Sequence, residues 1–290
     1  MAIGRNDLLL LSRLKAEGCI PDELSVIEIG AQQLTDDFLD SRAELQRIGE
    51  LFGAELPCPL PPALASSDSR GGGLRPLDAA APSARGFWTW LGFHYAAIDI
   101  DGSPEALQID LNYDVVPDEH RGAYRLVTNF GTTEHVANQL NAFKIIHDLT
   151  AVGGLMMHGV PAQGMFNHGL FNYNPKFFWM LARSNGYKWL HMNFLASKHQ
   201  QKLAKDVVDF LITYHPGFER RIENYGAEDC YATVALQKVF DIDYVAPLDV
   251  RTGTQTDNKL LAERYWTVFT PGVFDGPPVA RRNVKGGGRS

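Results

Sequence analysis

The feature that most constrains the fold is a short apolar strand that runs directly into a glycine turn, Val26-Ile27-Glu28-Ile29-Gly30. The apolar residues suit a strand buried on both faces, as in a parallel sheet. Gly30 removes a side chain where the chain must turn and where a ligand must come close. The pattern predicts the start of a βα unit and suggests a cofactor that carries a nucleoside.

Apolar strands and amphipathic helices alternate along much of the remaining chain. Helices are predicted over residues 5–18, 35–52, 135–149, 177–184 and 203–214. Strands are predicted over residues 95–100, 107–111, 124–128, 189–194 and 231–240, and a further strand is predicted to begin at residue 155. This alternation predicts an α/β fold, a three-layer sandwich with a mostly parallel central sheet.

A stretch rich in proline and glycine interrupts the alternation. Six prolines and the run Gly71-Gly72-Gly73 lie within residues 53–86, and they cannot continue a helix or a central strand. We expect an inserted surface loop or lid. Residues 1–284 are therefore predicted to form a single domain with an insertion at about 53–92, followed by a flexible, glycine-rich tail at 285–290.

Charge and composition narrow the partners. The formal charge is −7, which argues against a nucleic acid because phosphate binding needs a concentrated basic surface. No apolar run reaches the roughly 18 residues that span a membrane, and the start of the chain lacks the features of a signal peptide. We expect a cytoplasmic protein with a small-molecule partner, no membrane and reduced thiols at Cys19, Cys58 and Cys230. The oligomeric state is left open, with a homodimer as one option.

Acidic residues follow two of the predicted strands, at the edge where an open parallel sheet binds its ligand. Asp99 can accept two hydrogen bonds from a ribose diol, although a simple turn explains it equally well and is the better explanation for Asp101. Asp110 can accept from an adenine amino group, or it can cap the loop that follows. Both aspartates are candidate cofactor contacts.

A second strand runs into a polar turn within residues 124–136. Gly131 permits close approach of the backbone, and a threonine of the Gly-Thr-Thr-Glu sequence is expected to cap a helix that has Glu134 in its first turn. Asn129 and His135 lie at the rim where cofactor and acceptor would meet. We therefore take Asn129 and Gly131 as candidate cofactor contacts and His135 as a candidate catalytic residue.

In order along the chain, these segments resemble a class I S-adenosylmethionine-dependent methyltransferase. The resemblance covers about residues 22–195 and rests on Val-Ile-Glu-Ile-Gly, Ala-Ile-Asp-Ile-Asp, Ile-Asp-Leu-Asn, Leu-Val-Thr-Asn-Phe-Gly-Thr-Thr-Glu-His-Val and Gly-Gly-Leu-Met-Met-His-Gly-Val-Pro. It implies a Rossmann-like fold and S-adenosylmethionine as the cofactor, with Glu28 and Gly30 at the methionine pocket and Asp99 at the ribose. Two features depart from the family: Gln32 replaces its second glycine, and the first two strands are unusually far apart.

A loop predicted at residues 158–175 mixes aromatic rings, amides and two histidines. Such a loop suits a sugar, a polyketide or another hydroxylated small molecule. His158 and His168 are candidates for the base that removes a proton from a hydroxyl acceptor, with a structural role in a tight loop as the alternative.

The expected function is methyl transfer to a small molecule at a hydroxyl oxygen. No metal site is predicted, because no His-x-x-x-His or Glu-x-x-His spacing places two ligands on one helix face, although Glu134 and three histidines have the right chemistry. An NAD(P)-dependent oxidoreductase is the alternative enzyme, but Ala31-Gln32-Gln33-Leu34 lacks the glycines of a dinucleotide turn. A methyltransferase-like protein that binds without catalysis is the third hypothesis.

Overall fold

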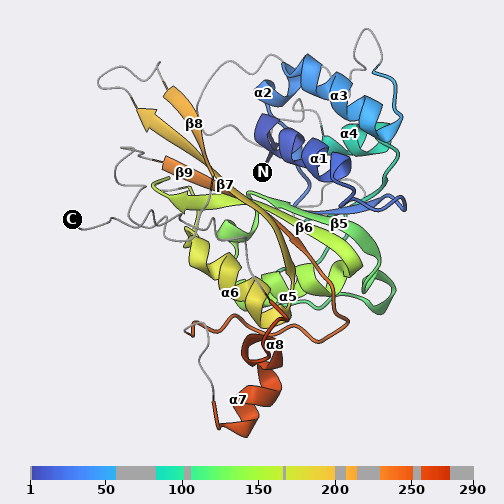
Figure 1. Ribbon diagram of the computed structural model, residues 1–290. Helices are drawn as coiled ribbons and strands as arrows, with labels where there is room; N and C mark the ends of the chain where they lie inside the picture. Colours follow the sequence, from blue (N-terminus) through green and yellow to red (C-terminus); the bar gives the residue numbers. More distant parts are fainter. Residues whose placement is uncertain are drawn as a thin grey trace, which may run out of the picture.

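The chain forms a three-layer sandwich in which helices cover both faces of a central sheet (Figure 1). This computed structural model describes residues 2–56, 83–100, 106–165, 168–199, 207–213, 229–250 and 256–274. Within these ranges, no helix is long and apolar enough to cross a membrane.

The elements follow one another in the order that an α/β fold requires. The strands are β1 (Ala2–Ile3), β2 (Ser25–Ile29), β3 (Gln33–Leu34), β4 (His94–Ile98), β5 (Tyr124–Phe130), β6 (Thr150–Gln163), β7 (Lys188–His199), β8 (Val207–Thr213) and β9 (Asp229–Gln237). The α-helices are α1 (Arg5–Ala16), α2 (Asp36–Leu39), α3 (Arg42–Phe52), α4 (Ala84–Trp90), α5 (Gln139–Leu149), α6 (Pro175–Asn185), α7 (Lys259–Arg264) and α8 (Trp266–Phe269). Two short 3-10 helices, η2 (Asp118–His120) and η3 (Thr133–His135), flank β5.

The order of strands in the main sheet is β4-β2-β5-β6-β9-β7-β8. The first four strands are mutually parallel, whereas β9 is antiparallel to both of its neighbours and β8 is antiparallel to β7. From β2 the chain passes first to β4 on one side and then to β5 on the other. A crevice for a ligand forms at such a reversal, beyond the carboxyl ends of the strands. The structure thus confirms the predicted Rossmann-like α/β fold.

Alternate residues of the strands enter two separate cores. Val26 and Leu126 pack with apolar residues of α1, α3 and α4, and Ile27 and Val127 pack with those of α5 and α6. Figure 1 shows these two groups of helices on opposite faces of the sheet. The continuous apolar character of the inner strands follows from this burial on both sides.

Two predicted elements are wrong. Residues 107–111 do not form a strand, and only Leu107 makes an isolated parallel bridge, with Ile98. Within the helix predicted over 203–214, residues 207–213 form strand β8, which pairs with β7. The run Val-Val-Asp-Phe-Leu-Ile-Thr is rich in residues that favour strands, and β7 offers it an edge on which to pair. Helices α7 and α8 were not predicted.

The boundaries around the proline-rich stretch also differ from the prediction. The helix predicted over 35–52 is divided into α2 and α3, and α4 lies inside the interval assigned to the insertion. Ser83 caps α4 by accepting a hydrogen bond from the backbone N–H of Arg85 at 3.2 Å, while Phe87 and Trp88 are buried. Residues 57–82, with Cys58, and the tail at 285–290 lie outside the described residues. Cys19 and Cys230 are free thiols.

Helix α5 begins later than predicted. Its N-cap is Asn138, whose side chain accepts a hydrogen bond from the N–H of Asn141 at 3.2 Å. No threonine caps it, and Glu134 and His135 belong to the separate turn η3. These two side chains therefore project from a short turn directly after β5.

Candidate functional site

The turn after β2 is held by hydrogen bonds from its own backbone. Gly30 has φ +78°, a conformation that favours glycine, and its N–H donates to the carbonyl of Ile98 at 2.8 Å. The N–H of Ala31 donates to Oδ2 of Asp99 at 2.9 Å, and the N–H of Gln32 donates to Oε2 of Glu28 at 2.9 Å. All three amides of the turn are thus engaged within the protein.

Glu28 supports this turn from inside the core. Its carboxylate is fully buried and also accepts hydrogen bonds from Nε1 of Trp88 at 2.7 Å and from the hydroxyl of Tyr95 at 2.8 Å. Burial raises the pKa of Glu28 to about 7, and the three hydrogen bonds oppose that rise. The side chain faces α4 and β4, so any influence of Glu28 on a methionine pocket passes through the turn that it holds.

Gln32, which departs from the family pattern, is also buried. Its Nε2 donates to the carbonyl of Thr128 at 3.3 Å, and its Oε1 lies 3.4 Å from the hydroxyl of Thr128. The side chain therefore connects the turn after β2 with the neighbouring strand β5.

The two candidate aspartates lie in different surroundings. Asp99, only 9% exposed, directly follows β4 beside the turn after β2. The next residue, Ile100, has an apolar side chain that is 66% exposed. Oδ1 of Asp110 accepts from the N–H of Asn112 at 2.8 Å, and the N–H of Asp110 donates to Oδ2 of Asp114 at 2.7 Å. Asp110 thus caps a local turn, as its alternative interpretation expects.

Asn129 and His158 lie in the core. Nδ2 of Asn129 donates to Oγ1 of Thr133 at 2.9 Å and contacts Nδ1 of His158 at 3.2 Å, and its Oδ1 accepts from the N–H of Thr133. A ligand would have to replace one of these contacts to reach Asn129.

The position of His158 corrects the prediction that it belongs to a surface loop. His158 is inside β6, 1% exposed, with its ring near Phe143 and Phe178. Burial lowers its pKa to about 3, so the imidazole is neutral at pH 7. Because His158 has almost no accessible surface, it is not placed to meet a substrate.

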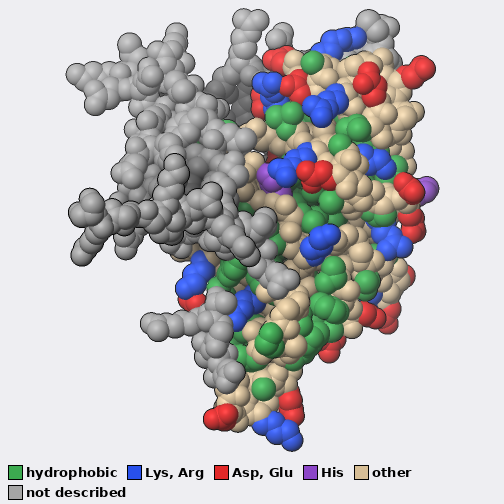
Figure 2. Space-filling view, in the orientation of Figure 1, with side chains coloured by type: hydrophobic (Ala, Val, Ile, Leu, Met, Phe, Trp, Pro, Cys, Tyr) green, Lys and Arg blue, Asp and Glu red, His purple; other side chains and the backbone are tan. Residues whose placement is uncertain are grey.

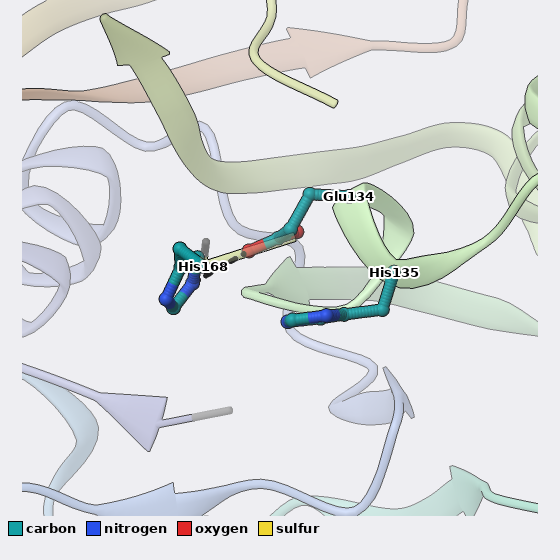
Figure 3. Close-up of side chains that lie close together, drawn as sticks. All are labelled: Glu134, His135 and His168. Atoms are coloured by element: carbon teal, nitrogen blue, oxygen red, sulfur yellow. Dashed lines mark ion pairs between the residues drawn. The ribbon is translucent and has the colours of Figure 1, made fainter. Parts of the chain in front are cut away.

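The junction after β5 brings three candidate side chains together. Gly131 has φ +80° and donates its N–H to the carbonyl of Gly159 at 2.9 Å. The next turn, η3, directs Glu134 and His135 toward the same space, where they meet His168 from the loop after β6 (Figure 3). Nε2 of His168 lies 3.5 Å from Oε1 of Glu134.

Backbone contacts hold the His168 loop against η3. The carbonyl of Glu134 accepts from the N–H groups of Leu170 at 2.7 Å and Phe171 at 3.2 Å. A Cβ on Gly169 would lie 3.0 Å from Cγ of Glu134, so glycine permits this close approach. His135 and His168 are separated by a whole helix and strand, and no spacing rule relates them. The sequence signal that could have indicated this contact is the pair His168-Gly169, in the loop after the strand that pairs with β5.

The electrostatics of this cluster are unusual. The Glu134 side chain is fully buried, which raises its pKa, and the adjacent His168 opposes the rise. Burial and the neighbouring His168 lower the pKa of His135, so its imidazole is neutral at pH 7. The cluster thus offers a buried carboxylate and two partly exposed imidazoles.

Two cavities lined by described residues lie elsewhere, against α1. One of about 120 Å³ is lined by residues that include Arg13, His191 and Asn193. The other, of about 230 Å³, lies between α1 and α3 and includes Ser12 and Glu44. Neither contains any residue of the candidate site.

The chain is distantly similar to several solved methyltransferase structures. No protein-family model and no curated protein sequence matches the chain. Among solved structures, an S-adenosylmethionine-dependent methyltransferase from Thermotoga maritima, described as a possible histamine N-methyltransferase, is 13% identical with a TM-score of 0.36, over 79% of this chain and 88% of the other.

Two further structures are similarly distant. A methyltransferase of the same cofactor class from Archaeoglobus fulgidus is 11% identical with a TM-score of 0.35, over 79% of this chain and 94% of the other. The trans-methyltransferase CalH, in complex with S-adenosylhomocysteine, is 14% identical with a TM-score of 0.32, over 80% of this chain and 54% of CalH. By its own sheet order, the chain has the Rossmann-like fold expected of a class I methyltransferase.

Proposed function

We propose that the protein is an S-adenosylmethionine-dependent methyltransferase that acts on a small molecule at a hydroxyl oxygen. The observation that carries the proposal is the reversal of strand order at β2, with Asp99 after β4 on one side and the Glu134, His135 and His168 cluster after β5 on the other. The two strands are separated by β2, so their ends lie about 10 Å apart. A nucleoside with its attached chain bridges such a span.

The residues at the β4 side suit the nucleoside. The carboxylate of Asp99 can accept hydrogen bonds from a ribose diol while Oδ2 keeps its bond from the N–H of Ala31. Ile100 offers exposed apolar surface on which an adenine ring can pack. When bound, the cofactor supplies a methyl group already activated by a positively charged sulfur.

The turn after β2 argues against a nicotinamide dinucleotide. A pyrophosphate needs free backbone N–H groups at the start of a helix. Here the N–H groups of Gly30, Ala31 and Gln32 are all engaged within the protein, and the chain continues into β3 before α2 begins at Asp36. This arrangement favours a cofactor without a pyrophosphate.

The cluster after β5 suits a hydroxylated acceptor. Leu170 and Phe171, which follow His168, leave apolar side chains 65% and 39% exposed, so part of the acceptor can be apolar. The neutral imidazole of His135 can accept a hydrogen bond or a proton from the hydroxyl. Figure 2 shows basic and acidic side chains interspersed on the face that it presents, which does not favour a nucleic acid. Homodimerisation and a cytoplasmic location stay predictions.

Calorimetric titration of the full chain tests the cofactor. We expect micromolar binding of S-adenosylmethionine and S-adenosylhomocysteine, and no binding of NAD⁺. Binding of NAD⁺ alone, or of none of the three, would contradict the proposal. Binding of S-adenosylmethionine without transfer to any hydroxylated acceptor in a screen would favour the non-catalytic alternative.

Asp99→Asn tests the ribose contact. Asparagine keeps an oxygen for the N–H of Ala31 but loses the charge, so we expect S-adenosylmethionine to bind about 1 to 3 kcal/mol more weakly in calorimetry. Asp22→Asn, at a fully exposed aspartate in the loop before β2, is the matched control and should bind like the parent chain. Unchanged affinity in a folded Asp99→Asn variant would remove Asp99 from the site.

A further inference from the structure

Glu134, His135 and His168 converge more closely than a general-base site requires. One donor atom of each residue lies within 4.8 Å of the donor atoms of the other two. Figure 3 shows the carboxylate and both imidazoles directed toward one space, two of them from η3 and the third from the loop after β6. Two imidazoles and a carboxylate are a common set of ligands for a transition metal.

The Glu134 carboxylate is an independent sign that a cation is expected there. Its side chain is 0% exposed, and neither Oε1 nor Oε2 has a hydrogen-bond partner in the described part of the chain. The 3.5 Å contact with His168 is longer than an ordinary hydrogen bond. A buried carboxylate without partners is costly, whereas one that coordinates a metal is compensated.

The distance between two of the three proposed ligands is close to that in a metal site. Ligand atoms bound at 2.0 to 2.1 Å in a tetrahedral site lie roughly 3.4 Å apart. The contact between His168 and Glu134 already has this length at 3.5 Å. The rings of His135 and His168 have centroids 5.3 Å apart and are tilted by 55° rather than stacked, so both can direct a nitrogen at one point. Both imidazoles are partly exposed and can adjust.

Hydrogen bonds within the protein fix the position of Glu134, the buried member of the cluster. The carbonyl of Glu134 binds the N–H groups of Leu170 and Phe171, and Asn129 holds the preceding Thr133 through its backbone and its side chain. Contacts of this kind orient metal ligands and commonly raise the affinity of a site. Asn129 thereby acquires a positioning role instead of the predicted contact with the cofactor.

We propose that Glu134, His135 and His168 bind a divalent transition metal such as Zn²⁺. The nitrogen ligands disfavour Mg²⁺ and Ca²⁺, which prefer oxygen. Three protein ligands leave at least one position open, as in catalytic zinc sites. If the proposed methyl transfer holds, that position binds the acceptor hydroxyl, and the metal lowers the pKa of the hydroxyl so that its proton passes to water. With the metal bound, His135 acts as a ligand and no longer accepts that proton.

Calorimetric titration of the chelator-treated full chain with Zn²⁺, without S-adenosylmethionine, tests the site. We expect one ion per chain with micromolar or tighter affinity, no heat from Mg²⁺, and a visible absorption band of tetrahedral Co²⁺. His135→Ala, His168→Ala and Glu134→Gln should each weaken Zn²⁺ binding by about tenfold or more. His94→Ala, which removes an exposed histidine at the opposite end of β4, is the control and should bind like the parent chain.

Several results would overturn the site. One is the absence of Zn²⁺ binding. Another is equal affinity in the parent chain and all three ligand variants, which would mean that Zn²⁺ binds adventitiously at the surface. At the same Zn²⁺ concentration, the melting temperature should also rise less in Glu134→Gln than in the parent chain, and equal rises in both would count against the proposal. Because no cofactor is present, these outcomes are independent of whether the chain binds S-adenosylmethionine.

Discussion

Glu28 and Glu134 are both completely buried, yet their surroundings are opposite. The Glu28 carboxylate accepts hydrogen bonds from the backbone of Gln32 and from Trp88 and Tyr95. The two oxygens of Glu134 have no hydrogen-bond partner among the described residues. Burial raises the pKa of each carboxyl group. Burial and a shifted pKa therefore do not distinguish a structural carboxylate from a functional one, whereas the inventory of partners does.

The difference follows from where each residue lies in the fold. Glu28 is within β2, and its side chain points into the layer between the sheet and α4, where donors are fixed around it. Glu134 is in the short turn η3 beyond the end of β5, at the edge where the sheet binds its ligand. If the proposed metal site holds, the partner of the Glu134 carboxylate is a bound cation, and the comparison with Glu28 leads to three predictions.

The largest expected effect is on Glu28. Glu28→Ala leaves three buried donors without an acceptor, so we expect the free energy of unfolding to fall by about 3 to 5 kcal/mol. Urea denaturation followed by circular dichroism measures it. Tyr95→Phe, which removes one of the three donors, should cost about 1 kcal/mol and serves as the smaller matched change. A loss below about 1 kcal/mol in Glu28→Ala would mean that the hydrogen bonds do not hold the turn.

Much of the fold could be predicted because positions that are buried in the fold carry apolar residues in the sequence. Val26, Ile27 and Ile29 are apolar because β2 is covered on both faces. Gly30 and Gly131 lie in turns that need a positive φ, which glycine adopts readily. Strand β8 was mistaken for a helix because its apolar residues fit both periods, and pairing with β7 decided the outcome. Tertiary pairing of this kind is not local information.

The candidate site was less predictable. His168 and His135 were chosen for their chemistry, but their convergence on Glu134 depends on the backbone contacts of residues 169–171. The sequence places Glu134 in the first turn of a helix, whereas in the structure that helix begins later, with Asn138 as its N-cap. His158 was misplaced because its strand extends farther than the apolar run suggests. Sequence patterns identified reactive side chains, and only the fold showed which of them meet.

A second prediction concerns the pH dependence of stability. The native state keeps a proton on Glu28 up to about pH 7, whereas an unfolded glutamate releases it near pH 4.5. Unfolding therefore releases a proton between these values, and rising pH favours the unfolded state. Relative to Glu28→Gln, the parent chain should lose about 2 to 3 kcal/mol of stability between pH 4.5 and 7 in urea titrations. Asp7, whose pKa is also raised to about 7, is present in both chains and cancels. A parallel pH profile in the two proteins would show that Glu28 is ionised throughout.

The smallest effect should have the opposite sign. Glu134→Gln removes a buried carboxyl group that has no hydrogen-bond donor in the described structure and whose pKa is raised by burial. At alkaline pH, where this group is ionised, the metal-free variant should be more stable than the parent chain by about 1 kcal/mol. Glu28→Gln is the matched control. There the same substitution places an amide N–H₂ group, itself a donor, opposite buried donors, so it should destabilise the chain. Urea denaturation in the presence of chelator measures both variants. A loss of stability in Glu134→Gln would mean that His168 already compensates the carboxylate as an ion pair. A gain would show that the chain tolerates an unfavourable charge at this edge of the sheet, as the proposed cation site requires.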